Sequence, residues 1–262
     1  MTGLDEQLKQ ISKWREDVTF FLLDYNTRKV IYEYNADMIR TIGSITKLIS
    51  AYVLLDDKLT SEESRNEIIT IDKEVSDISF SHNYSCYEQY RVNETYSAGE
   101  LLNMCLIPSG CASTLALVKH FYSDENAFIG RMSEYMEKLH INASFRDCYG
   151  ISPYNRCTAR GIASLAAEII DKHPEILSIT SRKSVMLNRI EYRNTSSLIK
   201  DDLVPGMDGL KSGTTLVSGH CYLGTAQRDG HRVISIVMNA LTKEELNAAT
   251  KALLEYGLSQ KL

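Results

Sequence analysis

The chain has 262 residues, of which 29 are basic and 34 acidic, with a formal net charge of −5 and 44% hydrophobic residues. These values are typical of a globular protein and exclude collagen-like and wholly disordered chains. The basic residues are scattered along the sequence, so we expect no surface that follows nucleic-acid phosphates and no nucleic-acid partner.

No run in the sequence approaches the ~20 apolar residues of a membrane-spanning helix, so we expect no membrane span. Residues 1–17 are polar, with apolar residues at a spacing that predicts an amphipathic helix. These apolar residues are Leu4, Leu8, Ile11 and Trp14. The segment lacks the apolar centre of a secretory signal, and no signal peptide is visible.

Strands are predicted at both ends of the chain. Near its beginning, apolar runs at 18–23 and 30–34 flank a polar turn, which is the pattern of a β-hairpin. Near its end, runs at 221–226 and 233–238 flank Asp229-Gly230, a strong turn pattern. A hairpin is therefore expected at each end.

Helices are predicted between the two hairpins. One starts near Ser44, where apolar residues recur at helical spacing, and one follows a capping box made by Ser97 and Glu100. Further helices are expected at 112–122, 126–140, 158–171 and 243–258, the last opened by a second capping box at 242–245.

Strands at both ends with helices between them predict an α/β (α+β) protein whose termini meet in one antiparallel sheet. Helices would cover that sheet, and the middle of the chain would form a mainly helical lobe. We expect one domain over residues 1–262, with a sheet lobe from about 1–56 and 200–262.

The cysteine pattern offers no metal site. No C-x-x-C pair and no H-E-x-x-H motif is present, so we expect neither metal nor cofactor. Cys105 and Cys221 lie in apolar runs and are interpreted as buried thiols. An even number of cysteines permits disulfides without arguing for them. The six cysteines are Cys86, Cys105, Cys111, Cys148, Cys157 and Cys221.

The first chemical motif is Ser44-Ile-Thr-Lys47. A serine at a helix start lies at the positive end of the helix dipole, and a lysine three residues later lies on the same face. If that lysine is desolvated, it can act as a general base. The motif alone is weak, because Ser197-Leu-Ile-Lys200 is a second copy. We interpret that copy, which runs into Asp201-Asp202, as an incidental match in a loop.

Two further motifs are ambiguous alone. Ser109-Gly110-Cys111 follows Pro108 and could be an ordinary turn that leaves a helix. Lys211-Ser212-Gly213-Thr214 combines a strand lysine with a glycine, so backbone can approach a substrate closely and a cation can meet a carboxylate. It could also be the charged edge of a sheet.

The order and spacing of the motifs are more specific. Ser44 and Ser109 are 65 residues apart, and Ser109 and Lys211 are 102 residues apart (109−44 and 211−109). With this conjunction the sequence resembles serine penicillin-recognising enzymes, in particular low-molecular-mass penicillin-binding proteins of the D-alanyl-D-alanine carboxypeptidase type. The resemblance covers about residues 18 to 258 and implies a β-lactamase/transpeptidase-like fold. Its segments are 44–53, 106–110, 208–213 and 217–222.

The resemblance implies three catalytic residues. Ser44 attacks the carbonyl between the two D-alanines of a peptidoglycan stem peptide, and Lys47 accepts its proton. Ser109 relays a proton to the leaving amine. Water then releases the acyl group, whereas release by an acceptor amine would make the protein a transpeptidase. β-Lactams would acylate the same serine and leave slowly.

The resemblance also implies a substrate-binding group. Lys211, with the hydroxyls of Ser212 and Thr214, would hold the terminal carboxylate beside Gly213. The backbone N–H groups of Ser44 and Thr214 would form the oxyanion hole. The implied partners are a pentapeptide that ends in D-Ala-D-Ala and β-lactam antibiotics, and the implied location is the outer side of the cytoplasmic membrane.

Three positions depart from the family pattern. Cys111 replaces an asparagine whose amide would bond the lysine and the substrate, so substrate positioning is in doubt. Thr214 stands where histidine often follows the Lys-Thr-Gly motif. Tyr149-Gly150-Ile151 stands for a His-Gly-Leu stretch, so both changes remove an imidazole.

Several alternatives remain beside the carboxypeptidase. Efficient β-lactamase activity is disfavoured, because residues 147–158 contain no Glu-x-x-Leu-Asn pattern and Glu168 lies in a predicted helix. A transpeptidase, or a penicillin-binding paralogue with little turnover, stays possible. Many relatives continue into a small β-rich domain and an amphipathic anchor. Because this chain ends at Leu262, we expect neither part here.

Overall fold

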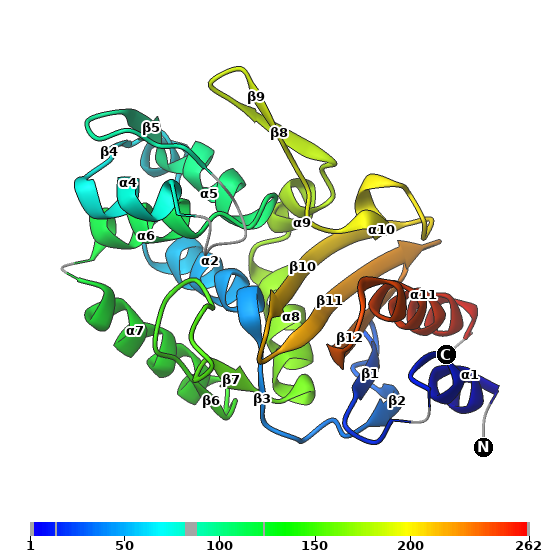
Figure 1. The fold of residues 1–262 in the computed structure, drawn as a ribbon. Coiled ribbons are helices and arrows are strands. Elements are labelled where there is room, and N and C mark those ends of the chain that lie inside the picture. The colour runs from blue at the N-terminus through cyan, green and yellow to red at the C-terminus, as the bar shows by residue number, and fades with distance from the viewer. Residues whose placement is uncertain (1–2, 14, 82–87, 123, 261–262) are drawn as a thin grey trace.

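The two ends of the chain pair in one antiparallel sheet of order β10-β11-β12-β1-β2 (Figure 1). The computed structural model describes residues 3–13, 15–81, 88–122 and 124–260, so Trp14 and Cys86 lie outside the described residues. The strands are β1 (Thr19–Asp24), β2 (Val30–Tyr34), β10 (Met207–Thr215), β11 (Gly219–Arg228) and β12 (His231–Ala240). Both predicted hairpins are confirmed, and β1 joins them by pairing with β12.

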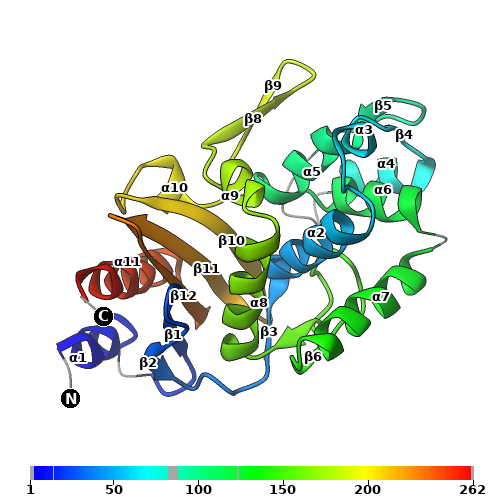
Figure 2. The same ribbon diagram turned by 180° about the vertical axis from the view of Figure 1, so that it is seen from behind.

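The alternation of side chains along β1 gives the sheet two apolar faces. Phe20 and Leu22 pack with α1 (Gly3–Ile11) and α11 (Lys243–Ser259), while Phe21 and Leu23 face the larger core on the other side. There α8 (Ala159–Lys172) covers β1 and β12 (Figure 2). This arrangement confirms a sheet covered by helices on both faces.

Helices dominate the middle of the chain and enclose the larger core. The central helix α2 (Thr46–Asp57) follows the 3₁₀ turn η1 (Gly43–Ile45) and packs against α5, α6 and α7. The helices of this region are α3 (Glu62–Arg65), α4 (Lys73–Ser79), α5 (Ala98–Leu106), α6 (Cys111–Phe121), α7 (Glu125–Lys138), α9 (Glu175–Thr180) and α10 (Ser197–Lys200). The predicted helices all occur, with ends within a few residues of the expected ones.

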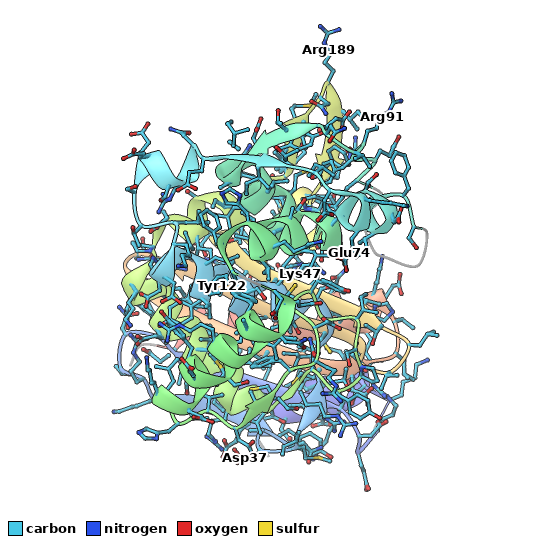
Figure 3. The ribbon with its side chains drawn as sticks, turned by 90° about the vertical axis from the view of Figure 1, so that its left-hand side faces the viewer. Asp37, Lys47, Glu74, Arg91, Tyr122 and Arg189 are labelled. Carbon is cyan, nitrogen blue, oxygen red and sulfur yellow. The ribbon has the colours of Figure 1, made fainter. Side chains whose placement is uncertain are left out.

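Short strands in this region were not predicted. The hairpin β8–β9 projects from the body of the molecule (Figure 1), with Arg189 at its outer tip (Figure 3). Strands of two to four residues are too short to show a period of two in the sequence. They are β3 (Arg40–Thr41), β4 (Ile68–Thr70), β5 (Thr95–Ser97), β6 (Ala143–Ser144), β7 (Arg156–Cys157), β8 (Ser184–Leu187) and β9 (Ile190–Arg193).

The ends of three helices test two predicted capping boxes and one predicted helix length. Ser97 and Glu100 form the expected capping box at α5. Thr242 caps α11, but the reciprocal bond is absent, because Glu245 accepts from the backbone N–H of Leu241 and pairs with Arg15 instead. The N-terminal helix ends at Ile11 rather than continuing to residue 17. The capping box predicted at 242–245 is therefore confirmed for Thr242 and wrong for Glu245.

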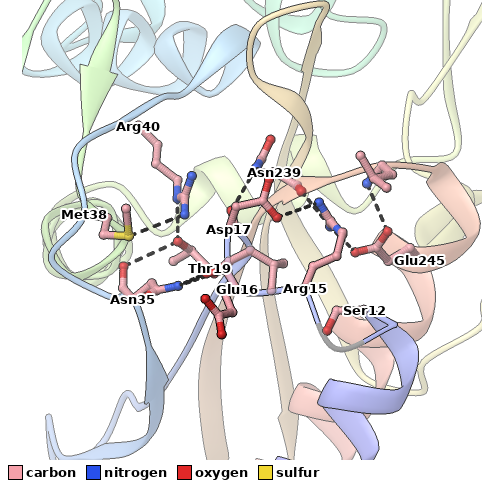
Figure 4. Close-up of polar contacts among 12 residues, drawn as sticks. Ser12, Arg15, Glu16, Asp17, Thr19, Asn35, Met38, Arg40, Asn239 and Glu245 are labelled. Atoms are coloured by element: carbon pink, nitrogen blue, oxygen red, sulfur yellow. Dashed lines mark hydrogen bonds and ion pairs between the residues drawn. The ribbon is translucent and has the colours of Figure 1, made fainter.

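Arg15 connects the N-terminal segment to β12 and α11 (Figure 4). Its guanidinium donates to the backbone oxygen of Asn239 at 2.9 Å and lies 2.6 Å from a carboxylate oxygen of Glu245. On the other side of β1, Arg40 donates to the hydroxyl of Thr19 at 2.7 Å. None of the described helices is long and apolar enough to cross a membrane.

Asp208 should contribute strongly to stability. It makes two hydrogen bonds of 2.8 and 2.7 Å with Arg232, which is 5% exposed in the sheet. Asp208→Asn would leave a buried guanidinium short of its charged partner, so we expect unfolding in urea to lose about 2 kcal/mol. The exposed pair of Asp202 with Lys183 is the matched control. Asp202→Asn should cost less than about 0.5 kcal/mol, and equal losses for both variants would contradict the prediction.

Candidate active site

Ser44 and Lys47 face each other at the start of the central helix. The ammonium nitrogen of Lys47 lies 3.0 Å from the hydroxyl oxygen of Ser44. Ser44 sits in η1 and is 4% exposed, whereas Lys47 is completely buried on the first turn of α2. The arrangement therefore places a hydroxyl within hydrogen-bond distance of a buried lysine nitrogen.

The loop after Phe145 supplies the second acceptor for Lys47. The backbone oxygen of Tyr149 accepts from the ammonium at 2.6 Å. Asp147 shapes this loop by accepting the backbone N–H groups of four residues, Tyr149, Gly150, Ile151 and Ser152. The sequence did not reveal this contact, because it is made by a backbone atom.

Ser109 enters the same cleft from the turn between α5 and α6. It is 2% exposed and has a φ of +68°, a left-handed conformation that is unusual for serine. Two hydrogen bonds hold the next residue, from the N–H of Gly110 to the oxygen of Met104 and from the hydroxyl of Thr114 to the oxygen of Gly110. These bonds fix the backbone of the turn that carries the Ser109 hydroxyl.

Strand β10 closes the opposite side. A Cβ on Gly213 would lie 2.6 Å from the backbone oxygen of Ile42 and 3.1 Å from the backbone nitrogen of Ser44. Only glycine permits this close approach, which brings the N–H of Thr214 near Gly43. Lys211, two residues earlier on the same strand, is 2% exposed and donates to the oxygen of Ser212 at 3.2 Å.

A cavity of about 710 Å³ is lined by residues from several of these segments. Four of the predicted residues line it, namely Ser44, Ser109, Ser212 and Thr214. The others (Lys47, Cys111, Lys211 and Gly213) are buried or lie directly behind the lining. Residues that the sequence did not indicate also line it, among them Thr195, Lys200, His220, Lys243 and Asn247. None of the described residues that line the cavity carries a carboxylate.

His220 restores an imidazole to the cleft. It faces Thr214 across the β10–β11 ladder, and its Nδ1 lies 3.1 Å from the hydroxyl oxygen of Thr214. Burial lowers the pKa of His220, and the charge of Lys243 lowers it further. The two departures from the family pattern each remove an imidazole, but strand pairing brings in a histidine from another position.

Cys111 is the first residue of α6 and is completely buried beside Lys47. Burial raises the pKa of the Cys111 thiol, and the charge of Lys47 opposes that shift. The thiol is therefore the protonated form at neutral pH. Cys105 and Cys221 are also buried, as predicted, and the five described cysteines are all free thiols.

The second Ser-x-x-Lys copy is not an incidental loop. Ser197 and Lys200 form the helical turn α10, and both line the cavity. The hydroxyl of Ser197 accepts from the side chain of Asn247 at 2.8 Å. The prediction of a loop here was wrong, because residues 197–200 form a helical turn that packs beside β10.

Glu168 lies on α8, as predicted. Its carboxylate pairs with Lys172 at 2.9 Å and accepts from the hydroxyl of Tyr52. It is not among the residues that line the cavity. Glu168 therefore has a structural partner on its own helix.

Known proteins match this chain over most of its length. The model of the D-alanyl-D-alanine carboxypeptidase family matches residues 14–242. The D-alanyl-D-alanine carboxypeptidase DacA of Haemophilus influenzae is 26% identical over 92% of this chain and 61% of its own length. DacC of Escherichia coli is 27% identical over 91% of this chain and 60% of its own length. The chain thus spans about 60% of the length of these relatives.

The fold has solved counterparts. A penicillin-binding protein of Listeria monocytogenes in its ampicillin-bound form has a TM-score of 0.80 and 27% identity, covering 92% of this chain and 96% of that one. By the extent of the family match, the chain belongs to the D-alanyl-D-alanine carboxypeptidase family.

Proposed function

We propose that this chain is a serine-type D-alanyl-D-alanine carboxypeptidase that acts through an acyl-enzyme on Ser44. The observation that carries the proposal is the 3.0 Å contact between Lys47 and Ser44, in one cleft with Ser109 and β10. Because the chain spans only part of its relatives' length, their activity is carried over as a proposal.

In the first step, Ser44 attacks the carbonyl carbon of the penultimate D-alanine while Lys47 takes its proton. The backbone N–H groups of Ser44 and Thr214 lie in one corner, where Gly213 brings β10 against η1. Two fixed donors there would stabilise the oxyanion as the tetrahedral intermediate forms. The peptide carbon–nitrogen bond then breaks, and the leaving amine of the last D-alanine needs a proton.

Ser109 is proposed to pass that proton from Lys47 to the leaving amine. The terminal carboxylate of the substrate would lie against β10, where Lys211 supplies positive charge and Ser212 and Thr214 supply hydroxyls. The absence of carboxylates from the described lining favours an anion there. Water completes the cycle by hydrolysing the ester, with the proton returning to Ser44.

The proposal extends to ligands, location and domain. A β-lactam would acylate Ser44 and leave slowly, as an analogue of the D-Ala-D-Ala end. Peptidoglycan stem peptides are on the outer side of the cytoplasmic membrane, so we propose that the protein acts there. We also propose that the two lobes form one penicillin-binding catalytic domain, since the cleft is built from both.

Ser44→Ala should abolish covalent labelling by a fluorescent penicillin, because the ester oxygen is removed. Ser197→Ala, the serine of the second Ser-x-x-Lys copy, is the matched control and should still form one adduct. Denaturing gel electrophoresis and peptide mass mapping would report both. An adduct on Ser197, or none on the wild type, would contradict the proposed nucleophile.

The same preparations distinguish turnover from binding. The wild type should release D-alanine from a peptide that ends in D-Ala-D-Ala, and Ser44→Ala should not. Coupled detection of free D-alanine measures this. Labelling of the wild type without release of D-alanine would favour a penicillin-binding protein with little turnover.

Cys111→Asn should raise kcat/KM for the peptide by about fivefold, since an amide adds a hydrogen bond worth about 1 kcal/mol. The thiol now beside Lys47 is a poor donor and acceptor. Steady-state kinetics would measure the change, with a thermal unfolding curve to exclude a packing defect at this buried position. Unchanged or lower kcat/KM in a stably folded variant would refute the idea that the cysteine limits positioning.

A further inference from the structure

A buried carboxylate that the proposed mechanism does not use lies directly behind the second motif. Glu88 is 2% exposed. One of its oxygens accepts the backbone N–H of Ala112 at 2.7 Å, and the other accepts the backbone N–H of Ser113 at 2.9 Å and the Ser113 hydroxyl. The carboxyl group thus accepts two backbone N–H groups in the first turn of α6.

Glu88 performs the capping that the sequence of α6 lacks. The residue before this helix is Gly110, which has no side chain to satisfy the first N–H groups. A Cβ on Gly110 would lie 2.2 Å from a carboxylate oxygen of Glu88. The glycine therefore leaves room for a distant carboxylate to occupy the capping position and meet the positive end of the helix dipole.

The cap bears on Ser109 because only Gly110 separates this serine from α6. Ser109 is held in a left-handed conformation, with its hydroxyl aimed into the cavity region. Fixing the first N–H groups of α6 fixes the end of the turn that carries it. Cys111, the first residue of the helix, is fixed by the same bonds.

Burial and the surrounding donors and charges act on the pKa of Glu88 in opposite directions. Burial raises the pKa of Glu88, while the hydrogen bonds from Ser113 and Ala112 and the charge of Lys47 oppose that shift. Other titratable groups meet the same region. The thiols are those of Cys105 in α5 and Cys111 in α6, and the charges of Lys211 and Asp147 act on the pKa of one thiol each. The hydroxyl of Tyr90 contacts that of Ser113, and the hydroxyl of Tyr192 donates to the backbone oxygen of Glu88.

The main chain of Glu88 is held as firmly as its side chain. Its backbone oxygen accepts from the hydroxyl of Tyr192, on β9, at 2.9 Å, and its N–H donates to the oxygen of Ser79 at 3.1 Å. The Tyr90 hydroxyl lies 2.7 Å from that of Ser113. Tyr192, a buried residue of the projecting hairpin, thus contacts the residue that caps α6.

We propose that Glu88 is a positioning residue for acylation, which fixes Ser109 through the start of α6. The inference rests on the proposed function. Loss of this cap would loosen the turn that carries Ser109 without removing a group that lines the cavity.

The test separates the acylation rate constant from the initial binding constant, measured with a fluorescent penicillin. Glu88→Gln keeps the size of the side chain, but its amide NH₂ would oppose one of the donors, so we expect acylation to slow by about threefold. Glu88→Ala, which removes the cap entirely, should acylate at least about tenfold more slowly. The binding constant should stay at the wild-type value in both variants, because Glu88 does not line the cavity.

Thr158→Ala is the matched control for the loss of a helix cap. The hydroxyl of Thr158 accepts from the N–H of Gly161 at the start of α8, outside the cavity. It should lower the melting temperature without changing the acylation rate constant. If Glu88→Ala acylates at the wild-type rate, or loses binding and acylation alike as a merely structural variant would, the proposal is overturned while Ser44 labelling of the wild type stands.

A second variant covers the case in which the Glu88 variants do not fold. Ser113→Ala removes one of the three donors, so acylation should slow by about threefold, equal to one weak hydrogen bond, with the binding constant unchanged. A wild-type rate in this variant would overturn the positioning role. No labelling of the wild type would overturn the proposed function and this inference together.

Discussion

The burial of one ammonium group organises the molecule. Lys47 is fully enclosed, and an ammonium removed from water costs several kcal/mol unless acceptors surround it. Its acceptors come from two places, the Ser44 hydroxyl one turn away and the Tyr149 carbonyl about a hundred residues later in the chain. The loop that carries Tyr149 therefore has to fold onto α2, and Asp147 gives that loop its shape. Ser44, Lys47 and the loop of Tyr149 thus meet at a single buried side chain.

The sequence predicted the parts of the site that depend on residue type and order. Ser44, Ser109 and Lys211 belong to motifs whose spacing is specific, and the cleft brings their segments together as expected. The strands at the two ends were predictable because each is a run of β-formers flanking a turn. Their pairing through β1 and β12 followed from the need to bury two apolar faces.

What the sequence could not predict depends on partners distant in the chain. The Tyr149 carbonyl is a backbone atom, and any residue type could supply it. His220 enters the cleft only through the register of β10 with β11. Glu88 caps a helix that begins more than twenty positions later, so no local capping pattern reveals it. The second Ser-x-x-Lys segment lacks a periodic apolar stretch, and only tertiary packing turns it into a wall of the cleft.

The composition of the cavity wall has a consequence for the rate of encounter with ligands. The chain as a whole is anionic, with a formal charge of −5, yet the described wall carries lysines and hydroxyls and no carboxylate. A concave wall with lysines concentrates positive potential, so it attracts a small anion into the cavity. The net negative charge of the whole chain repels a large anionic surface. Added salt should damp both effects, because the Debye length falls to about 8 Å at physiological ionic strength. Selection between small and large anions would then begin before any contact is made.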